Sequence, residues 1–226
     1  MAAAVRTALV TGANRGIGLA VARCLRDRGL QVVVAARDAA AAAAVAAELD
    51  GRWVAMDVTD PASVTAAAAA AGPVDVLVCN AGTLRDGGSD PLTVPMDDVA
   101  ATVAVNLLGT WRVAQAFVPD MVARGWGRVA VVSSGTASFS GGLFAGTPGY
   151  TVSKTALNAV TVLLADATRG SGVLVNAVNP GRVRTRMMPG ATTSPQQAAG
   201  AVADIALLPD DGPSGVFLRD GRIVGW

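Results

Sequence analysis

The sequence predicts a single α/β domain in which helices cover both faces of a doubly wound parallel sheet of about seven strands. Short β-branched runs alternate with longer alanine-rich stretches along most of the chain. The short runs are continuously apolar, as expected for parallel strands that are buried on both faces. A length of 226 residues suits one well-buried domain, and no repeat, linker or change of composition divides it. We therefore treat residues 1–226 as one domain.

The expected strands are the short apolar runs, which in chain order are Ala8–Val10, Gln31–Ala35, Trp53–Met56, Val74–Val78, Arg128–Val132, Val173–Val178 and a last strand near Val216–Leu218. The expected helices are the longer stretches between them, namely Gly16–Arg28, Ala39–Leu49, Pro61–Ala71, Met96–Ala123, Tyr150–Thr168 and Pro195–Leu208. Asp60 followed by Pro61 favours a helix start, with the aspartate as cap and the proline as first helical residue. Gly29 and Gly125 are expected to end the helices that precede them.

The composition excludes several classes of function. A net charge of +1 gives no long-range attraction to nucleic acid or to an anionic membrane. The chain has no histidine, and Cys24 and Cys79 lie far apart, so we expect no metal site. The stretch Met1–Thr7 lacks the long apolar core of a signal peptide, and the alanine runs are too weakly apolar to span a membrane. These features predict a cytoplasmic protein. The 52% of hydrophobic residues further predict burial in a homodimer or homotetramer.

A glycine-rich turn, Thr11–Gly18, joins the first expected strand to the first expected helix. Its glycines permit a tight turn, close approach of the backbone to phosphate, and close packing of helix on sheet. The helix that follows presents free N–H groups and a favourable dipole to a pyrophosphate. We therefore predict a dinucleotide site here. Its predicted contacts are Gly12, Asn14, Arg15, Gly16, Ile17 and Gly18.

Tyr150 is the only tyrosine of the chain and Lys154 the only lysine. Residues four apart share one face of a helix, so the phenol and the ammonium can converge on one small molecule. A nearby cation favours the phenolate and lowers the pKa of a tyrosine from its ordinary value of about 10. Because no histidine is present, Tyr150 is the candidate group for proton transfer at neutral pH.

The glycine spacing and the Tyr-x-x-x-Lys pair resemble those of the short-chain dehydrogenases/reductases, in particular carbonyl-reductase-like members, over nearly the whole chain. Cys79-Asn80-Ala81-Gly82 is similar to the family's Asn-Asn-Ala-Gly motif, with cysteine in place of the first asparagine. Asn106 matches the helix asparagine of the catalytic tetrad, and Ser133-Ser134 ends the strand that carries the catalytic serine. The resemblance implies a Rossmann fold and hydride transfer between a nicotinamide and an alcohol or carbonyl carbon. The implied catalytic residues are Asn106, Ser134, Tyr150 and Lys154.

The resemblance also implies a role for each of these residues. Tyr150 protonates the developing alkoxide, and Lys154 lowers the pKa of that tyrosine and binds the nicotinamide ribose. Ser134 holds the substrate oxygen, and Asn106 positions a water that links Lys154 to solvent.

Two serines are candidates for the catalytic position. In most relatives the serine precedes the tyrosine by thirteen positions, and Ala137 stands there in this chain. The loop Gly135–Gly149 is longer than usual, which leaves Ser134 at the strand end as the match. Ser138 is the alternative candidate for the catalytic serine. If it is not catalytic, it is an ordinary turn serine.

The end of the second strand predicts the choice of cofactor. An arginine at this position accommodates the 2′-phosphate of NADP, whereas an acidic residue binds the ribose hydroxyls of NAD. Arg37 stands there, and Arg15 in the glycine turn supplies a second cation. We therefore predict NADP(H), with NAD(H) as the alternative if Asp38 reaches the ribose.

The resemblance supplies the remaining contacts. Further cofactor contacts are expected from Asp57, Val58, Asn80, Ala81, Gly82, Pro180, Gly181, Val183 and Thr185. Three loops, Thr83–Pro91, Gly135–Gly149 and Arg186–Pro195, are expected to surround the substrate. They contribute the apolar side chains of Leu84, Phe139, Leu143, Phe144, Met187 and Met188. The pocket is therefore expected to take a small apolar carbonyl compound.

The predicted function is NADPH-dependent reduction of a small or medium apolar ketone or aldehyde. A second possibility is a tailoring reductase of a biosynthetic pathway that acts on a ketone, quinone or imine. A third, of another class, is a binding protein that senses NADP(H) without turnover. Loss of Tyr150 or Lys154 would favour that third reading, and the chain retains both.

Overall fold

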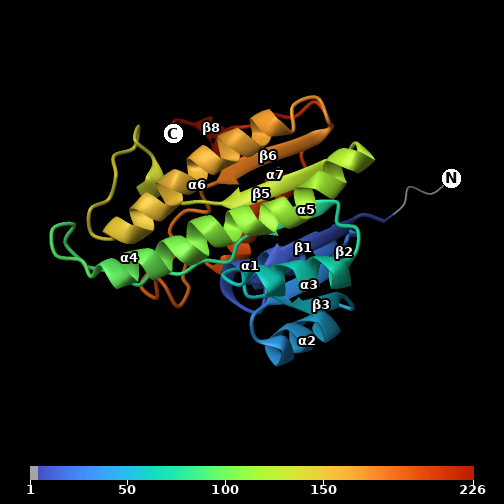
Figure 1. The fold of residues 1–226 in the computed structure, drawn as a ribbon, viewed down its shortest axis with the longest axis horizontal. Helices are drawn as coiled ribbons and strands as arrows, with labels where there is room; N and C mark the ends of the chain where they lie inside the picture. The colour runs from blue at the N-terminus through green and yellow to red at the C-terminus, as the bar shows by residue number, and fades with distance from the viewer. Residues whose placement is uncertain (1–4) are drawn as a thin grey trace.

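A computed structural model describes residues 5–226 and has one eight-stranded sheet with helices on both faces (Figure 1). Residues 1–4, part of the stretch expected not to be a signal peptide, lie outside the described range. The strand order is β3-β2-β1-β4-β5-β6-β7-β8, and all neighbours are parallel except the antiparallel pair β7–β8. This confirms the predicted doubly wound α/β fold. The strands are β1 (Thr7–Thr11), β2 (Gln31–Ala36), β3 (Arg52–Ala55), β4 (Val76–Cys79), β5 (Gly127–Val132), β6 (Val173–Val178), β7 (Phe217–Arg219) and β8 (Arg222–Val224).

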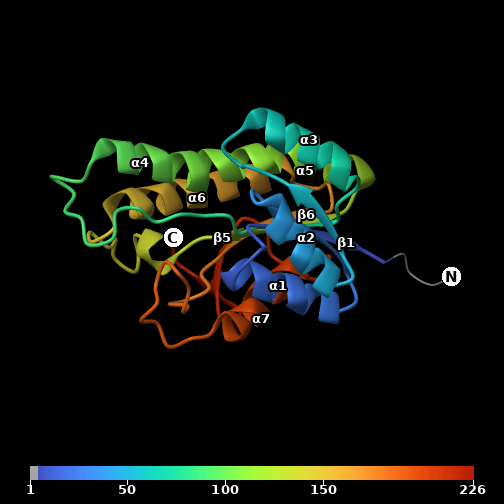
Figure 2. The same ribbon diagram turned by 90° about the horizontal axis from the view of Figure 1, so that it is seen from below.

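The helices form two layers, one on each face of the sheet (Figure 2). The chain forms α1 (Gly16–Asp27), α2 (Ala39–Glu48), α3 (Pro61–Ala71), α4 (Met96–Val103), α5 (Thr110–Arg124), α6 (Pro148–Ala167) and α7 (Pro195–Ala206). One core cluster packs α1, α2 and α7 against the sheet, and the other packs α3, α5 and α6 against its opposite face. Side chains alternate along a strand, so neighbouring residues enter different clusters, as Leu9 and Val10 do. Within residues 5–226, no helix is both long and apolar enough to cross a bilayer.

Local signals set several helix ends as the sequence predicts. Asp60 caps α3 by accepting a 2.9 Å hydrogen bond from the N–H of Ala62, and Pro61 is the first helical residue. Gly125 ends α5 in the left-handed conformation with φ 74°, where glycine is favoured because it has no Cβ. The start of α3 and the end of α5 therefore lie where the sequence predicts them.

Two parts of the chain differ from the prediction. The expected helix Met96–Ala123 contains six residues of π-helix, Ala104–Gly109, between α4 and α5. A π-helical turn within an α-helix frequently lies at a functional site. The strand β8 is an addition at the end of the sheet, joined to β7 by Asp220 and Gly221, which both have positive φ. That pair is typical of a two-residue hairpin turn.

The order of the strands determines where a site can form. The chain leaves β1 toward one side of the sheet through β2, and it returns to the other side of β1 at β4. A crevice forms outside the carboxyl ends of the strands at such a reversal. The register pairs Val10 with Val78, so the turn after Thr11 and the segment after Cys79 lie side by side.

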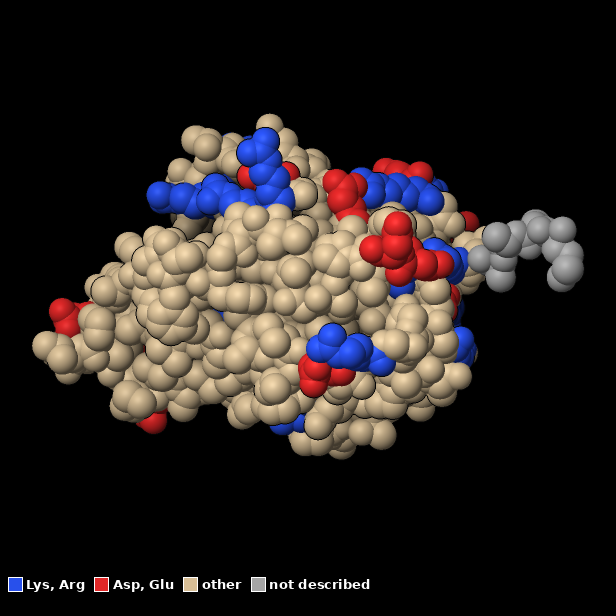
Figure 3. Space-filling model, turned by 90° about the horizontal axis from the view of Figure 1, so that it is seen from above, with Lys and Arg blue, Asp and Glu red and all other residues tan. Residues whose placement is uncertain are grey.

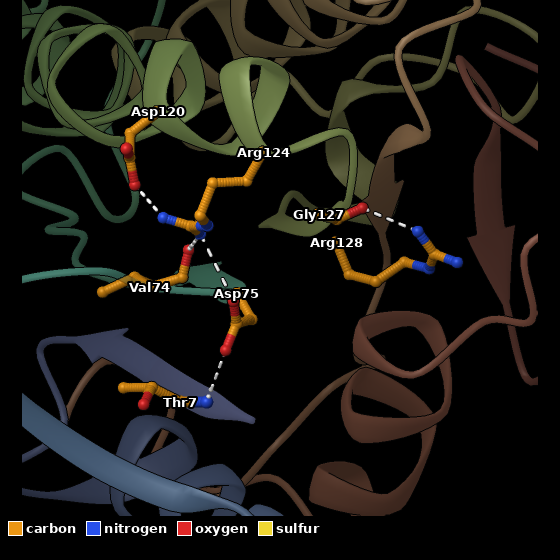
Figure 4. Close-up of polar contacts among 7 residues, drawn as sticks. All are labelled: Thr7, Val74, Asp75, Asp120, Arg124, Gly127 and Arg128. Carbon is orange, nitrogen blue, oxygen red and sulfur yellow. Dashed lines mark hydrogen bonds and ion pairs between the residues drawn. The ribbon is translucent and has the colours of Figure 1, made fainter. Parts of the chain in front are cut away.

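Polar side chains also tie together the opposite, amino-terminal edge of the sheet (Figure 4). Arg124 pairs with Asp120 and Asp75 and donates to the carbonyl of Val74, and Asp75 accepts from the N–H of Thr7. The network lies far from the carboxyl edge and is therefore assigned to stability.

Arg128 lies at the same edge and is only 1% exposed. It donates to the carbonyls of Leu208, Gly127 and Gly172 and pairs with Asp210. Its guanidinium also stacks 4.3 Å from the ring centre of Trp126. Burial lowers the pKa of Arg128, and the bond to Asp210 partly opposes that change.

Candidate active site

Asn80 and Thr11 lock the glycine turn to the end of β4. The Asn80 side chain donates to the carbonyls of Thr11 at 2.9 Å and Gly12 at 3.3 Å. The Thr11 hydroxyl accepts from the N–H groups of Asn80 at 2.9 Å and Ala81 at 3.0 Å. A Cβ on Gly18 would collide with the Asn80 side chain and the Gly12 carbonyl. The glycines are therefore required by packing as well as by the turn.

The turn leaves the amino terminus of α1 free to bind an anion. No side chain caps this helix end, and its first turn has no acidic residue. Gly16 begins the helix at φ 58°, and Cγ2 of Thr185 would lie 3.7 Å from a Cβ placed on it. Thr185 is thus beside the turn, as the sequence predicts for the loop that includes Pro180 and Gly181. Val183 is buried and pairs with Thr193.

This arrangement fits a dinucleotide. The glycines of the turn have no side chain of their own, and the free N–H groups at the start of α1 can donate hydrogen bonds to phosphate oxygens. Asn14 and Ile17 are only partly exposed, whereas Arg15 is fully exposed at the start of α1. Such a helix end requires no metal ion to hold a pyrophosphate. Among the described residues, no three carboxylate, thiol or imidazole groups gather into a possible metal site.

The side chains near β2 have different partners. Asp38 caps α2 by accepting a 3.0 Å hydrogen bond from the N–H of Ala41, whereas Arg37 is exposed and has no ion pair among residues 5–226. Hydrogen bonds from Thr59 lower the pKa of Asp57, and the charge of Arg37 contributes in the same direction. Arg37 therefore lies close to Asp57, at the predicted adenosine end of the site.

Val58, the other half of that predicted pair, is buried. Its carbonyl accepts from Arg112 at 2.5 Å, and its side chain contacts Gly109 so closely that a Cβ there would collide with it. Packing of the π-helix therefore holds this side chain, and only the backbone of Val58 is available to a ligand.

Tyr150 lies in the first turn of α6, where it is partly exposed. Burial raises the pKa of Tyr150, and the interaction of its hydroxyl with the Ser134 side chain lowers the pKa in part. The lowering expected from Lys154 is absent from this structure, because the ammonium lies 5.9 Å from the ring centre and burial dominates. The phenol therefore stays protonated at neutral pH.

Lys154 is buried behind the tyrosine. Its Nζ donates to the carbonyl of Val132 at 2.7 Å. Burial lowers the pKa of Lys154 to about 8. Cys79 lies near it, and burial raises the pKa of that thiol to about 12, so the thiol is neutral. Lys154 therefore loses its charge as the pH rises through about 8.

Asn106 lies in the π-helix and is completely buried. Its Oδ1 accepts from the N–H of Thr83 at 2.8 Å, and its Nδ2 donates to the Thr83 carbonyl at 2.9 Å and to Ser153 Oγ at 3.0 Å. A Cβ on Gly82 would lie 3.3 Å from Asn106 Oδ1 and 3.8 Å from Lys154 Nζ. Asn106 is therefore next to the lysine, with its amide engaged in holding the loop after β4. The water-positioning role implied for it stays a prediction.

The three serines near the end of β5 have different surroundings. Ser133 is buried and donates to Asn158 at 2.6 Å. Ser138 is also buried, where it bonds Ser140 and donates to the carbonyl of Gly225. Ser134 Oγ accepts from the N–H of Thr136 at 3.3 Å and from its hydroxyl at 3.0 Å, and the Ser134 side chain partly lowers the pKa of Tyr150. Because the Ser138 hydroxyl is engaged with Gly225, Ser134 is favoured over Ser138 as the serine of the site.

The structure brings only some of the predicted substrate-binding residues toward Tyr150. Phe139 and Leu143 line an apolar groove of about 510 Å³ with the outer face of α6 and Trp226, and neither Tyr150 nor Ser134 contributes to it. Phe144 and Met187 are exposed, and Leu84 is partly buried beside Gly87. In this structure the loops therefore leave the tyrosine open on one side.

The sequence analysis missed three residues that hold this site. Thr11 fixes the Asn80 segment, and it could have been found because it opens the glycine turn. Ser153 and Asp86 hold the backbone of Tyr150, and neither has a motif that would single it out. Together the groups present a protonated phenol and a hydroxyl beside a dinucleotide cradle, which suits proton transfer to a carbonyl oxygen.

Comparison with known proteins matches residues 6–196 to the family model described as short chain dehydrogenase. Oxidoreductase UcpA of Escherichia coli strain K12 is 38% identical over 193 residues, 80% of this chain and 71% of that protein. The 3-oxoacyl-(acyl-carrier-protein) reductase FabG of the same strain is 33% identical, covering 88% of this chain and 82% of FabG. A solved short chain dehydrogenase/reductase family protein has a TM-score of 0.85 at 32% identity, covering 95% of this chain and 94% of that one. The chain therefore belongs to the short-chain dehydrogenases/reductases, NAD(P)(H)-using oxidoreductases of alcohol and carbonyl groups.

Proposed function

We propose that this enzyme reduces a small or medium apolar ketone or aldehyde with NADPH, and that Tyr150 donates the proton. The observation that carries the proposal is the protonated phenol of Tyr150 in the first turn of α6, with Lys154 behind it at the end of the sheet that holds the glycine turn. Lys154 lies behind the phenol and has the predicted helical spacing. No histidine is available for the same step.

In the proposed reaction, the bound cofactor supplies the hydride to the carbonyl carbon. The Ser134 hydroxyl donates to the carbonyl oxygen and orients it toward Tyr150. As negative charge develops on that oxygen, the O–H bond of Tyr150 breaks and its proton forms the alcohol. The tyrosine regains a proton from solvent. Below about pH 8, Lys154 is charged, and its ammonium can bind a ribose hydroxyl.

A panel of ketones and aldehydes, with NADPH consumption as the readout, tests this function and identifies the class of substrate. We expect turnover of apolar carbonyl compounds. Tight binding of NADPH without turnover of any of them would instead favour the cofactor-sensing alternative. Turnover confined to quinones or imines would favour the tailoring reductase.

We propose NADP(H) as the preferred cofactor because Asp38 is engaged as a helix cap and Arg37 forms no ion pair within residues 5–226. Substitution Arg37→Ser should lower kcat/KM for NADPH by roughly 10- to 100-fold, the value of a lost charge-assisted hydrogen bond. Activity with NADH should change by less than about threefold, since NADH has no 2′-phosphate. Steady-state kinetics with both cofactors measures the difference. Arg222→Ser, which removes an exposed arginine on β8, is the control, and a wild-type preference for NADH would refute the proposal.

We also propose that the enzyme is a homodimer or homotetramer in which a second copy covers the outer face of α6. Val152 is 57% exposed and Leu163 is 59% exposed, and the apolar groove runs along this face. A broad band of the surface in Figure 3 is almost free of charged side chains, a property of surfaces that bind a protein partner. Light scattering should give a multiple of 22.5 kDa, and a monomer would refute the proposal.

A further inference from the structure

Asp86 is a buried carboxylate that serves a helix distant from it in sequence. It lies in the loop between β4 and α4 and is 1% exposed. Its Oδ2 accepts hydrogen bonds from the N–H groups of Gly149 at 2.5 Å and Tyr150 at 3.2 Å. Its Oδ1 is also buried and has no hydrogen-bond partner within residues 5–226. The carboxylate therefore faces the first turn of the helix that carries Tyr150 and Lys154.

Helix α6 has no cap of its own at this end. The Thr147 side chain makes no capping bond, and Pro148 has no N–H. Asp86 supplies both missing acceptors, and its charge is favourable at the positive end of the helix dipole. A buried carboxylate with one unsatisfied oxygen is nevertheless costly. A serine or aspartate at position 147 would cap the helix at less cost, so stability alone does not explain Asp86.

The loop and the helix start are packed too closely to move independently. A Cβ on Gly149 would lie 3.1 Å from Val99 Cα and 3.2 Å from Asp86 Oδ2. The N–H of Gly88 donates to the carbonyl of Gly146 at 2.8 Å, which ties the same loop to the segment before α6. The loop that carries Asp86 therefore fixes the first turn of α6 on two sides.

The peptide groups around Tyr150 are held at both ends. Asp86 accepts from the Tyr150 N–H, and Ser153 Oγ donates to the Tyr150 carbonyl at 2.7 Å. Ser153 in turn accepts from Asn106 Nδ2. The tyrosine hydroxyl is several bonds from its backbone, so a small rotation of the helix start moves it relative to Ser134.

We propose that Asp86 is a positioning residue, which places the Tyr150 hydroxyl against Ser134 by holding the first turn of α6. This inference rests on the proposed role of Tyr150 as proton donor. A displacement of about 1 Å at a reacting group can cost roughly 100-fold in rate. This role explains why a carboxylate with one unsatisfied oxygen is retained at position 86: its position relative to Tyr150 offsets the cost of burial.

Substitution Asp86→Ala is expected to lower kcat by about 10- to 100-fold while the Kd for NADPH changes less than about threefold. Asp86→Asn keeps an amide oxygen for the same two N–H groups, so its kcat should stay within about threefold of wild type. Val160→Ala, a buried position farther along α6, is the stability-matched control and should keep kcat. The proposal is overturned if folded Asp86→Ala keeps wild-type kcat, or if Asp86→Asn loses as much as Asp86→Ala.

If Asp86→Ala does not fold, Asp86→Ser decides the matter. Its hydroxyl is too short to reach both N–H groups, so a kcat below that of the asparagine variant is expected. An unchanged kcat would overturn the proposal.

A second readout needs no substrate. Tyr150 is the only tyrosine, so ultraviolet difference absorbance on raising the pH reports its ionisation alone. We expect the pKa of Tyr150 to move toward the ordinary value of about 10 in Asp86→Ala or Asp86→Ser, and not in Asp86→Asn. Identical titrations in all variants would overturn the proposal. If wild-type enzyme turned over no carbonyl compound, the proposed function would fail, and this titration would still judge the role of Asp86.

Discussion

Substitution Tyr150→Phe is expected to lower kcat for carbonyl reduction by about 10²- to 10⁴-fold, the usual contribution of a general acid. The variant removes only the hydroxyl, so the ring keeps its place in the first turn of α6. The loss should be this large because the other hydroxyl that contacts Ser134, that of Thr136, is an alcohol and a far weaker acid than the phenol. The rate of NADPH oxidation at saturating substrate measures it.

The Kd for NADPH distinguishes loss of the proton donor from damage to the glycine turn that is proposed to bind the cofactor. It should stay within about twofold of wild type, because the glycine turn is held by Asn80 and Thr11 and not by the phenol. Val152→Ala, an exposed neighbour on the outer face of α6, should leave both quantities unchanged. A Tyr150→Phe enzyme with wild-type kcat would show that another group gives the proton.

Substitution Arg128→Ala should lower the free energy of unfolding by about 3–5 kcal/mol, a large effect for one residue. The substitution leaves the carbonyls of Leu208, Gly127 and Gly172 without their charged donor at a buried position. It also removes the guanidinium stacked on Trp126. Urea unfolding followed by circular dichroism measures the change.

A matched arginine gives the control for this experiment. Arg222→Ala removes an exposed side chain on β8 and should change stability by less than about 0.5 kcal/mol. Because Arg128 lies at the amino-terminal edge of the sheet, the folded variant should keep the Kd for NADPH. A loss below about 1 kcal/mol would mean that solvent replaces the three carbonyl bonds.

Much of the fold follows from the sequence because both faces of this sheet are buried. Strands such as Val76–Cys79 are continuously apolar and buried along their whole length. The strand β8 was missed because it begins with Arg222 and lies mostly exposed, so it is not a buried apolar run, although the Asp220-Gly221 pair predicts a hairpin turn. The π-helix at Asn106 was missed because its residues fit a regular helix equally well.

The elements of the site were predictable where one short segment holds all the information. The glycine turn and the Tyr150–Lys154 spacing are local, and the reversal of strand order between β1 and β4 brings them to one edge. The pKa shifts of the site residues could not be predicted from short segments of sequence. Burial raises the pKa of Tyr150 and lowers that of Lys154, and burial depends on how α6 packs against the sheet. Asp86 reaches Gly149 only through that packing, so no pattern around residue 86 indicates its partner.

The most direct test of the account follows the hydride itself. Wild-type enzyme is incubated with an apolar ketone and NADPH that carries deuterium at the transferable position, and the alcohol is analysed by mass spectrometry. We expect alcohol with one deuterium on the carbinol carbon per NADPH consumed, because the hydride moves directly while the oxygen receives the Tyr150 proton. Alcohol without deuterium, or NADPH that stays bound while no alcohol forms, would contradict the account.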